Sequence, residues 1–212
     1  MSTAAADVVT ATTTIPADLD SERVVLLETL RKHRTLLRYT VRGLSEEDAR
    51  RRTTASTLTL ASILKHVLEV EEGWVDFLRT GVVAGADRWR TDEHAEDATA
   101  DTVESSADAA ESSSDAESSA DDAEVPDDFA LTDADTVEHL LARYEEVAAR
   151  TDDLVATGDL DVSHPLPPAP WFPEGARWSA RHVYAHIIGE TAQHSGHADI
   201  IRETLDGQRS MG

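Results

Sequence analysis

The sequence predicts an all-α protein, a four-helix bundle in a single domain. Four segments repeat apolar residues with the period of a helix, each between a polar capping residue and a glycine, and no segment shows the alternation typical of a strand. The chain has 212 residues, of which 40% are hydrophobic. This composition supports one buried core, in which the four helices cover one another's apolar stripes.

The first two helices are expected within residues 20–91. The first has Ser21 as its expected N-cap and Gly43 at its end. Its aliphatic stripe consists of Val24, Leu27, Leu30, Leu37 and Val41. Ser45 followed by Asp48 predicts a short helical turn after this helix.

The second helix should begin after the cap Thr59 and end at Gly81. Its apolar face consists of Leu60, Ile63, Leu64, Val67, Val70, Trp74 and Leu78. A stripe of this length predicts a helix buried along one side.

The last two helices are expected within residues 129–212. Thr132 together with Asp135 predicts the start of the third helix, and Ser179 and Gly207 predict the two ends of the fourth. The stretch between these helices holds most of the prolines of the chain. We expect it to be an irregular loop, because proline interrupts both helices and sheets.

Two segments lack the composition of a packed element. Residues 1–19 are rich in Ala and Thr with little periodicity, and residues 92–128 are rich in Ser, Ala and acidic residues with almost no large apolar side chains. Such segments cannot bury enough apolar surface to offset the entropy lost on ordering. We therefore expect a disordered N-terminal tail and a disordered acidic insert between the second and third helices.

The net charge is strongly negative, −23 at pH 7. Residues 92–128 contain 15 Asp and Glu and no Lys or Arg, so removing these 15 negative charges from −23 still leaves −8. Lys32 and Lys65 are the two lysines among 19 basic residues. An acidic, lysine-poor chain indicates adaptation to multimolar salt, as in a halophilic archaeon, and the alternative is an ordinary mesophilic protein with an acidic insert.

The composition excludes several classes of function. The chain has no cysteine, which rules out disulfides, thiolate ligands and a cysteine nucleophile. No stretch approaches the roughly 18 apolar residues of a membrane helix, and the first residues lack the basic and apolar regions of a signal peptide. Nucleic-acid binding calls for a basic face. We expect a cytoplasmic protein with no nucleic-acid and no membrane partner.

One face of the last helix gathers side chains that can bind a metal. Four of them follow one another at offsets of four, four and three: His186, Glu190, His194 and His197. Glu190 and His194 can reach one cation from consecutive turns. His66 is the best candidate for a third ligand, because it lies on an apolar face between Ile63 and Val70, where an unpaired imidazole is costly to bury.

Two imidazoles and one carboxylate leave coordination positions open, as catalytic metal sites do. Without thiolates Zn²⁺ is the default divalent metal, and Ni²⁺, Fe²⁺ and Mn²⁺ suit the same ligands. Structural alternatives stay open: the Glu190–His194 pair as a solvated contact worth about 0.2–0.5 kcal/mol, and His66 as a hydrogen-bonded core residue. Three further histidines are expected at the surface or as capping groups: His139, His164 and His182.

Three segments resemble the DinB/YfiT-like metal-dependent bundle proteins, in particular a branch related to mycothiol-dependent maleylpyruvate isomerase. They are GLSEEDARRRTTASTLTLASILKHVLEVEEGW, LLARYEEVAARTDDLV and HIIGETAQHSGHADIIRETLDG. The third is the most distinctive, because its string ETAQHSGHAD is long and unusual in composition. The resemblance covers residues 21–90 and 129–207 and leaves the acidic insert outside.

The resemblance implies one ligand histidine from the second helix and two ligands at i and i+4 on the last. Here these are His66, Glu190 and His194. Many DinB-like proteins have histidine at the position of Glu190, whereas the isomerase branch is similar to this chain in having glutamate. His197, just beyond the ligand pair, would orient a ligand or transfer a proton, and His186 would be an orienting partner or a structural residue.

The resemblance also implies a reaction class. Relatives with a known role are similar to transferases or isomerases in which the metal binds a low-molecular-weight thiol. We therefore expect a metal-dependent and thiol-dependent transferase or isomerase acting on a small molecule, with γ-glutamylcysteine rather than mycothiol in a halophilic archaeon. The alternatives are a metal-dependent hydrolase and a non-catalytic, stress-related metal-binding bundle. Because many relatives are dimers, a homodimer is a further expectation.

The charge pattern generates a prediction about salt. Raising KCl from about 0.1 M to above 1 M shortens the screening length from about 10 Å to below about 3 Å, which weakens repulsion between the acidic groups. The free energy of unfolding, measured by urea titration at each salt concentration, should therefore rise. In a variant lacking residues 92–128, the free energy of unfolding should still rise with salt. If the rise disappears in that variant, the alternative of an ordinary mesophilic protein with an acidic insert is favoured.

Overall fold

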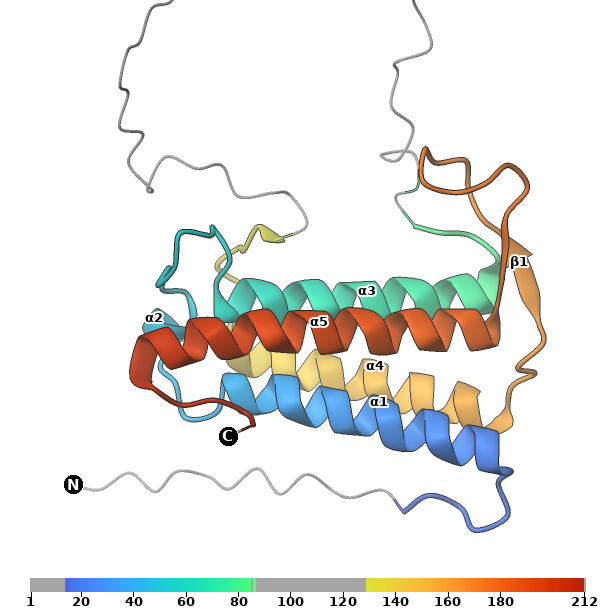
Figure 1. The fold of residues 1–212 in the computed structure, drawn as a ribbon, viewed down its shortest axis with the longest axis horizontal. Coiled ribbons are helices and arrows are strands. Elements are labelled where there is room, and N and C mark those ends of the chain that lie inside the picture. Colours follow the sequence, from blue (N-terminus) through green and yellow to red (C-terminus); the bar gives the residue numbers. More distant parts are fainter. Residues whose placement is uncertain (1–13, 85, 87–128, 212) are drawn as a thin grey trace, which may run out of the picture.

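The computed structural model describes residues 14–84, 86 and 129–211, and within them it is a bundle of four long helices (Figure 1). The helices are α1 (Ser21–Thr40), the one-turn α2 (Glu46–Ala49), α3 (Leu60–Thr80), α4 (Val137–Thr157) and α5 (Ala180–Asp206). The predicted all-α architecture is confirmed. The expected acidic insert, residues 92–128, lies outside the described residues. No helix in the described part of the chain has the length and apolarity needed to cross a membrane.

The chain contacts the bundle before α1 begins. Ile15 and Leu19 pack against the core, and the Leu19 amide donates to the Pro16 carbonyl at 3.4 Å. Residues 14–19, which belong to the expected disordered tail 1–19, thus include two side chains that contact the core. Residues 1–13 lie outside the described part of the chain.

Two of the expected helix caps are confirmed, and that of α1 shifts by one residue. Thr59 and Ser179 cap α3 and α5 as predicted, each accepting a backbone N–H three residues on. In α1 the cap is Asp20 and not Ser21, with the Asp20 carboxylate 3.0 Å from the Arg23 amide nitrogen. A carboxylate also interacts favourably with the positive end of the helix dipole, which a hydroxyl does not.

The third long helix begins later than predicted. Thr136 caps α4, and the Thr132–Asp135 pair forms a separate turn before it. In that turn the Asp135 carboxylate accepts from both the amide and the hydroxyl of Thr132, each at 2.8 Å. Arg50 donates to the carbonyls of Thr132 and Asp135 and so ties this turn to the end of α2.

A polar layer divides the core into two apolar clusters. One cluster includes Leu30, Phe77 and Ile187, and the other includes Leu37 and Leu64. Four buried polar side chains, one from each long helix, lie between these clusters along the chain: Arg34, Glu71, Thr151 and Thr191. Apolar stripes alone do not predict this layer.

Arg34 and Glu71 form a buried ion pair in the polar layer, with side chains 4% and 0% exposed. Arg34 donates from Nε to Glu71 Oε2 at 3.1 Å and from Nη2 to the other carboxylate oxygen. Its Nη1 donates to Asp152 at 2.7 Å, and the Thr151 hydroxyl donates to Glu71 at 2.5 Å. Because α1, α3 and α4 all contribute, we infer that the pair fixes their relative register.

The segment between α4 and α5 contains a small sheet, so the expectation of an irregular loop without strands is wrong there. Strand β1 (Ser163–Pro165) pairs antiparallel with β2 (Arg177–Ser179), and His164 lies opposite Trp178. The sheet stays short because the prolines that follow β1 cannot donate to a ladder. It leads directly into α5 and so orients Trp178 at the start of that helix.

His164 and Gly81 join this sheet to the end of α3. His164 Nε2 lies 3.0 Å from the Leu78 carbonyl oxygen, so the expectation of a capping role is confirmed. Gly81 ends α3 with φ of 73°, and a Cβ there would lie 2.9 Å from His164 Nδ1. Both the left-handed conformation and the close approach of the histidine favour glycine.

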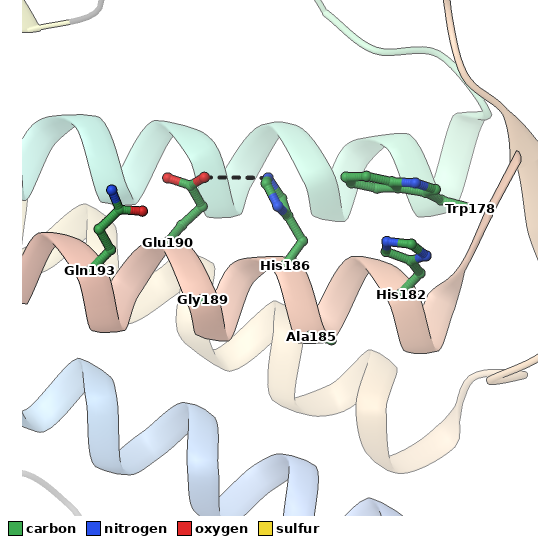
Figure 2. Close-up of a pocket in the computed structure, with 7 residues that line it drawn as sticks. All are labelled: Trp178, His182, Ala185, His186, Gly189, Glu190 and Gln193. Atoms are coloured by element: carbon green, nitrogen blue, oxygen red, sulfur yellow. Dashed lines mark ion pairs between the residues drawn. The ribbon is translucent and has the colours of Figure 1, made fainter. Parts of the chain in front are cut away.

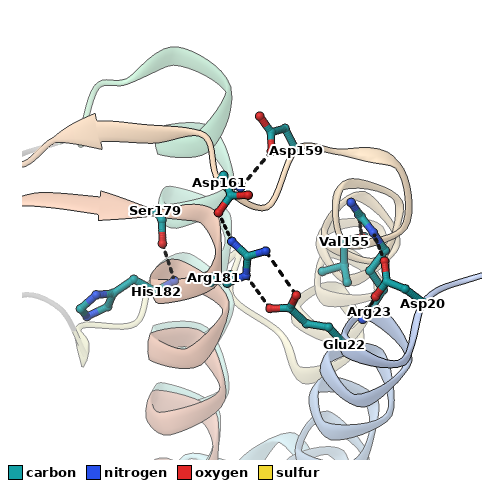
Figure 3. A network of polar contacts seen from close by, with 9 residues as sticks. All are labelled: Asp20, Glu22, Arg23, Val155, Asp159, Asp161, Ser179, Arg181 and His182. Carbon is teal, nitrogen blue, oxygen red and sulfur yellow. Dashed lines mark hydrogen bonds and ion pairs between the residues drawn. The ribbon is translucent and has the colours of Figure 1, made fainter.

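Ion pairs tie the start of α5 to the start of α1 (Figure 3). Arg181 donates to Glu22 at 2.5 Å and also pairs with Asp161 in the loop after α4. Arg23 donates to the Val155 carbonyl at 2.5 Å. The Arg181 pairs are exposed and screened by salt, so they add little to the stability of the bundle.

The buried ion pair yields a stability prediction. Glu71→Ala should lower the free energy of unfolding by about 3–5 kcal/mol, because it leaves the Arg34 charge buried with one partner fewer. The double variant Arg34→Met/Glu71→Leu should recover most of that loss. Both are measured by urea unfolding at fixed salt.

Asp76→Ala is the matched control, because Asp76 forms an exposed pair with Arg79 at 3.5 Å. This control should cost less than about 1 kcal/mol. Equal losses in Glu71→Ala and Asp76→Ala would show that the buried pair does not stabilise the bundle.

Candidate metal centre

His66, Glu190 and His194 converge where α3 packs against α5. One ligand-type atom of each side chain lies within 4.8 Å of those of the other two. Glu190 and His194 lie one turn apart on α5, and His66 reaches them from α3. The structure thus brings together the three side chains that the sequence singled out.

The two imidazoles and the carboxylate are close neighbours. The ring centroids of His66 and His194 are 4.7 Å apart with the planes at 64°, and His194 Nε2 lies 3.5 Å from Glu190 Oε2. Phe129 stacks on His66 at 4.2 Å between centroids. Sequence reasoning missed Phe129, although it is the first aromatic residue after the acidic insert.

The donor set fits a divalent transition metal. Imidazole nitrogens and a carboxylate are ligands that Zn²⁺, Ni²⁺, Fe²⁺ and Mn²⁺ accept. His194 is 8% exposed, and its Nδ1 is buried with no hydrogen-bond partner among the described residues. Unpaired buried polar atoms are uncommon and often reflect a water, an ion or a catalytic role.

The protonation of the site also suits a cation. The pKa of Glu190 lies below its ordinary value, chiefly because of its hydrogen bond with His194, while burial opposes the shift. Burial lowers the pKa of His186, and the nearby Glu190 charge only partly opposes this. At neutral pH Glu190 is therefore ionised and His186 is neutral.

His197 and His186 flank the three candidate ligands on α5. The His197 ring lies 5.4 Å from that of His194, and its buried Nδ1 has no hydrogen-bond partner within the described ranges. His186 Nε2 lies 3.7 Å from Glu190 Oε1, which is longer than a hydrogen bond (Figure 2). The roles expected for these two histidines, proton transfer and ligand orientation, stay predictions.

The other expected surface histidine, His139, is exposed. His182 is exposed too, but its ring stacks on Trp178 with centroids 4.3 Å apart and planes at 12°. Trp178 lies in β2, before α5 begins, so the helical spacing of four residues does not predict this contact.

An open groove of about 440 Å³ runs along α5 beside Glu190 (Figure 2). Its lining consists of Trp178, His182, Ala185, His186, Gly189, Glu190 and Gln193. The volume lies in the range of about 300–1,000 Å³ that is typical of small-molecule sites. A bound small molecule would therefore lie next to one of the candidate metal ligands.

Comparisons with known proteins identify one family. The family model described as mycothiol-S-transferase matches residues 25–116 and 106–207, which together span most of the chain. No curated protein and no solved structure matches the chain. The matched family is DinB-like, which confirms the resemblance of the three sequence segments, and it suggests a mycothiol-dependent transferase type of function. The chain belongs to the mycothiol-S-transferase family.

Proposed function

We propose that the protein is a metal-dependent transferase that joins a low-molecular-weight thiol to a small electrophile. The convergence of His66, Glu190 and His194 carries this proposal, because membership of the family by itself does not say which residues of this chain act. These three side chains would hold the ion, and the groove beside Glu190 would hold the electrophile. Zn²⁺ is the metal we propose, because two histidines and one glutamate are a ligand set of catalytic zinc sites.

The proposed reaction is a substitution at carbon. A divalent metal, when bound, stabilises thiolate over thiol and so supplies a nucleophile at neutral pH. The thiol sulfur forms a bond to the electrophilic carbon, and the leaving group departs with the electron pair of the bond that breaks. The unpaired Nδ1 of His197, 5.4 Å from His194 between ring centroids, supports His197 as the group that takes up the thiol proton.

Metal content tests the ligand set. Protein purified in high salt without chelator should contain about one transition-metal ion per chain by plasma mass spectrometry, as expected for a three-ligand site. His66→Ala removes the ligand on α3, and Glu190→Gln replaces the carboxylate on α5. Each variant should therefore lose the metal. His139→Ala is the control, since it removes an exposed histidine from α4. Retention of the metal in both ligand variants would contradict the assignment.

Thiol consumption tests the reaction. Metal-loaded protein should accelerate conjugation of mycothiol or γ-glutamylcysteine with 1-chloro-2,4-dinitrobenzene, and chelation should abolish the acceleration. His66→Ala should lower kcat/KM by about 100-fold or more. Loss of a metal ligand should have a larger effect than loss of a residue that only orients a ligand, which costs roughly 10–100-fold. Metal-dependent hydrolysis of an ester without thiol consumption would replace the transferase with a hydrolase.

A further inference from the structure

The groove beside Glu190 has an aromatic end and a polar end (Figure 2). Trp178 and His182 line the first, and Gln193 lies beyond Glu190 at the second. From His182 to Glu190 the axis of α5 advances about 12 Å, at 1.5 Å per residue. The groove is open above Gly189, where an added Cβ would meet no atom within 4 Å.

The aromatic end is held in place from several sides. Trp178 stacks on Trp74 at 4.7 Å and on His182 at 4.3 Å, and Phe172 meets it edge-on at 5.5 Å. Strand β2 fixes the Trp178 backbone opposite His164. Aromatic pairs are favourable at centroid separations of about 4.5–7 Å in offset or edge-to-face geometry. A flat ring entering the groove would meet a surface that is already ordered, which lowers the entropy lost on binding.

The charge of the lining disfavours anionic ligands. Among the described residues that line the groove none is Lys or Arg, and Glu190 is the only carboxylate. A phosphate or carboxylate at the aromatic end would find no cationic side chain nearby, because a metal ion held by Glu190 would lie about 12 Å further along the axis of α5. The aromatic end therefore suits an uncharged group.

We propose that the groove binds uncharged aromatic electrophiles, with the flat ring against Trp178 and His182 and the reactive carbon beside Glu190. This inference rests on the proposed function, because the thiol of that reaction is the nucleophile. With an arylmethyl halide the thiol sulfur bonds to the methylene carbon, and the halide leaves with the electron pair of the carbon–halogen bond. The thiol proton passes to solvent.

Gly189→Leu tests the groove by filling it. Gly196→Leu is the matched control, because Gly196 is also an exposed glycine within α5, with no atom within 4 Å of an added Cβ, and it is absent from the groove lining. Leucine favours a helix more than glycine does, so both variants should fold with a thermal midpoint at or above that of the wild type. Any difference in binding then reports the groove and not the fold.

The first readout is equilibrium binding of 2-naphthylmethanol, an unreactive aromatic probe, to metal-loaded protein without thiol. Its dissociation constant, measured by calorimetry, should rise about tenfold or more in Gly189→Leu and less than about twofold in Gly196→Leu. Cyclohexylmethanol should bind the wild type more weakly than the aromatic probe. Absence of naphthylmethanol binding, or equal affinity in wild type and Gly189→Leu, would overturn the inference.

The second readout separates this inference from the proposed function. With thiol present, the ratio of kcat/KM for 2-(bromomethyl)naphthalene to that for bromoacetamide should fall about tenfold in Gly189→Leu. Groove-dependent binding of naphthylmethanol without any thiol conjugation would support the groove and refute the proposed function. Conjugation of bromoacetamide without naphthylmethanol binding would overturn the groove inference and keep the function.

Discussion

The buried ion pair between Arg34 and Glu71 is the constraint on which the arrangement of the bundle depends. A shift in register between two aliphatic helix faces costs only a modest free energy, because leucine, valine and isoleucine can replace one another at a helix contact. A guanidinium displaced from its carboxylate would remain buried and unpaired, which is far more costly. Asp152 and Thr151 extend the same constraint to α4, so three helices share one preferred register.

That register positions the candidate metal centre. His66 precedes Glu71 by five residues on α3, and a slip of one turn, about 5.4 Å, would carry it away from Glu190 and His194. Near its C-terminal end, α5 is hydrogen-bonded to the end of α1 and the residues after it. Arg202 donates to the carbonyls of Thr40 and Arg42 at 2.8 and 3.0 Å. Residues that touch neither metal nor substrate thus decide whether the three candidate ligands meet.

The opposite end of α5 joins the fold to the groove. The short sheet delivers Trp178 to the start of the helix, and Trp178 then stacks on both Trp74 of α3 and His182 of α5. The indole therefore closes one end of the groove while it packs the end of the bundle. The same α5 face carries His182, His186 and Glu190 in successive turns, so the aromatic end and the candidate metal centre share one rigid element.

The amino-acid sequence was enough to predict the four long helices and the three residues of the candidate site. Helix periodicity placed His66 on an apolar face and Glu190 and His194 one turn apart, and capping chemistry located the starts of α3 and α5 at Thr59 and Ser179. These features depend on neighbours within about four residues along the chain, so local patterns reveal them.

The other features arise only when helices and strands pack together. The polar layer around Glu71 requires side chains from different helices to meet in the core, and the stacking of Phe129 on His66 joins residues on either side of the insert. The pairing of β1 with β2 and the groove beside Glu190 likewise need segments that are distant in sequence. Such contacts depend on how whole helices and strands pack. The pattern of apolar residues along the sequence shows the period of each element, but it does not show which other element packs against it.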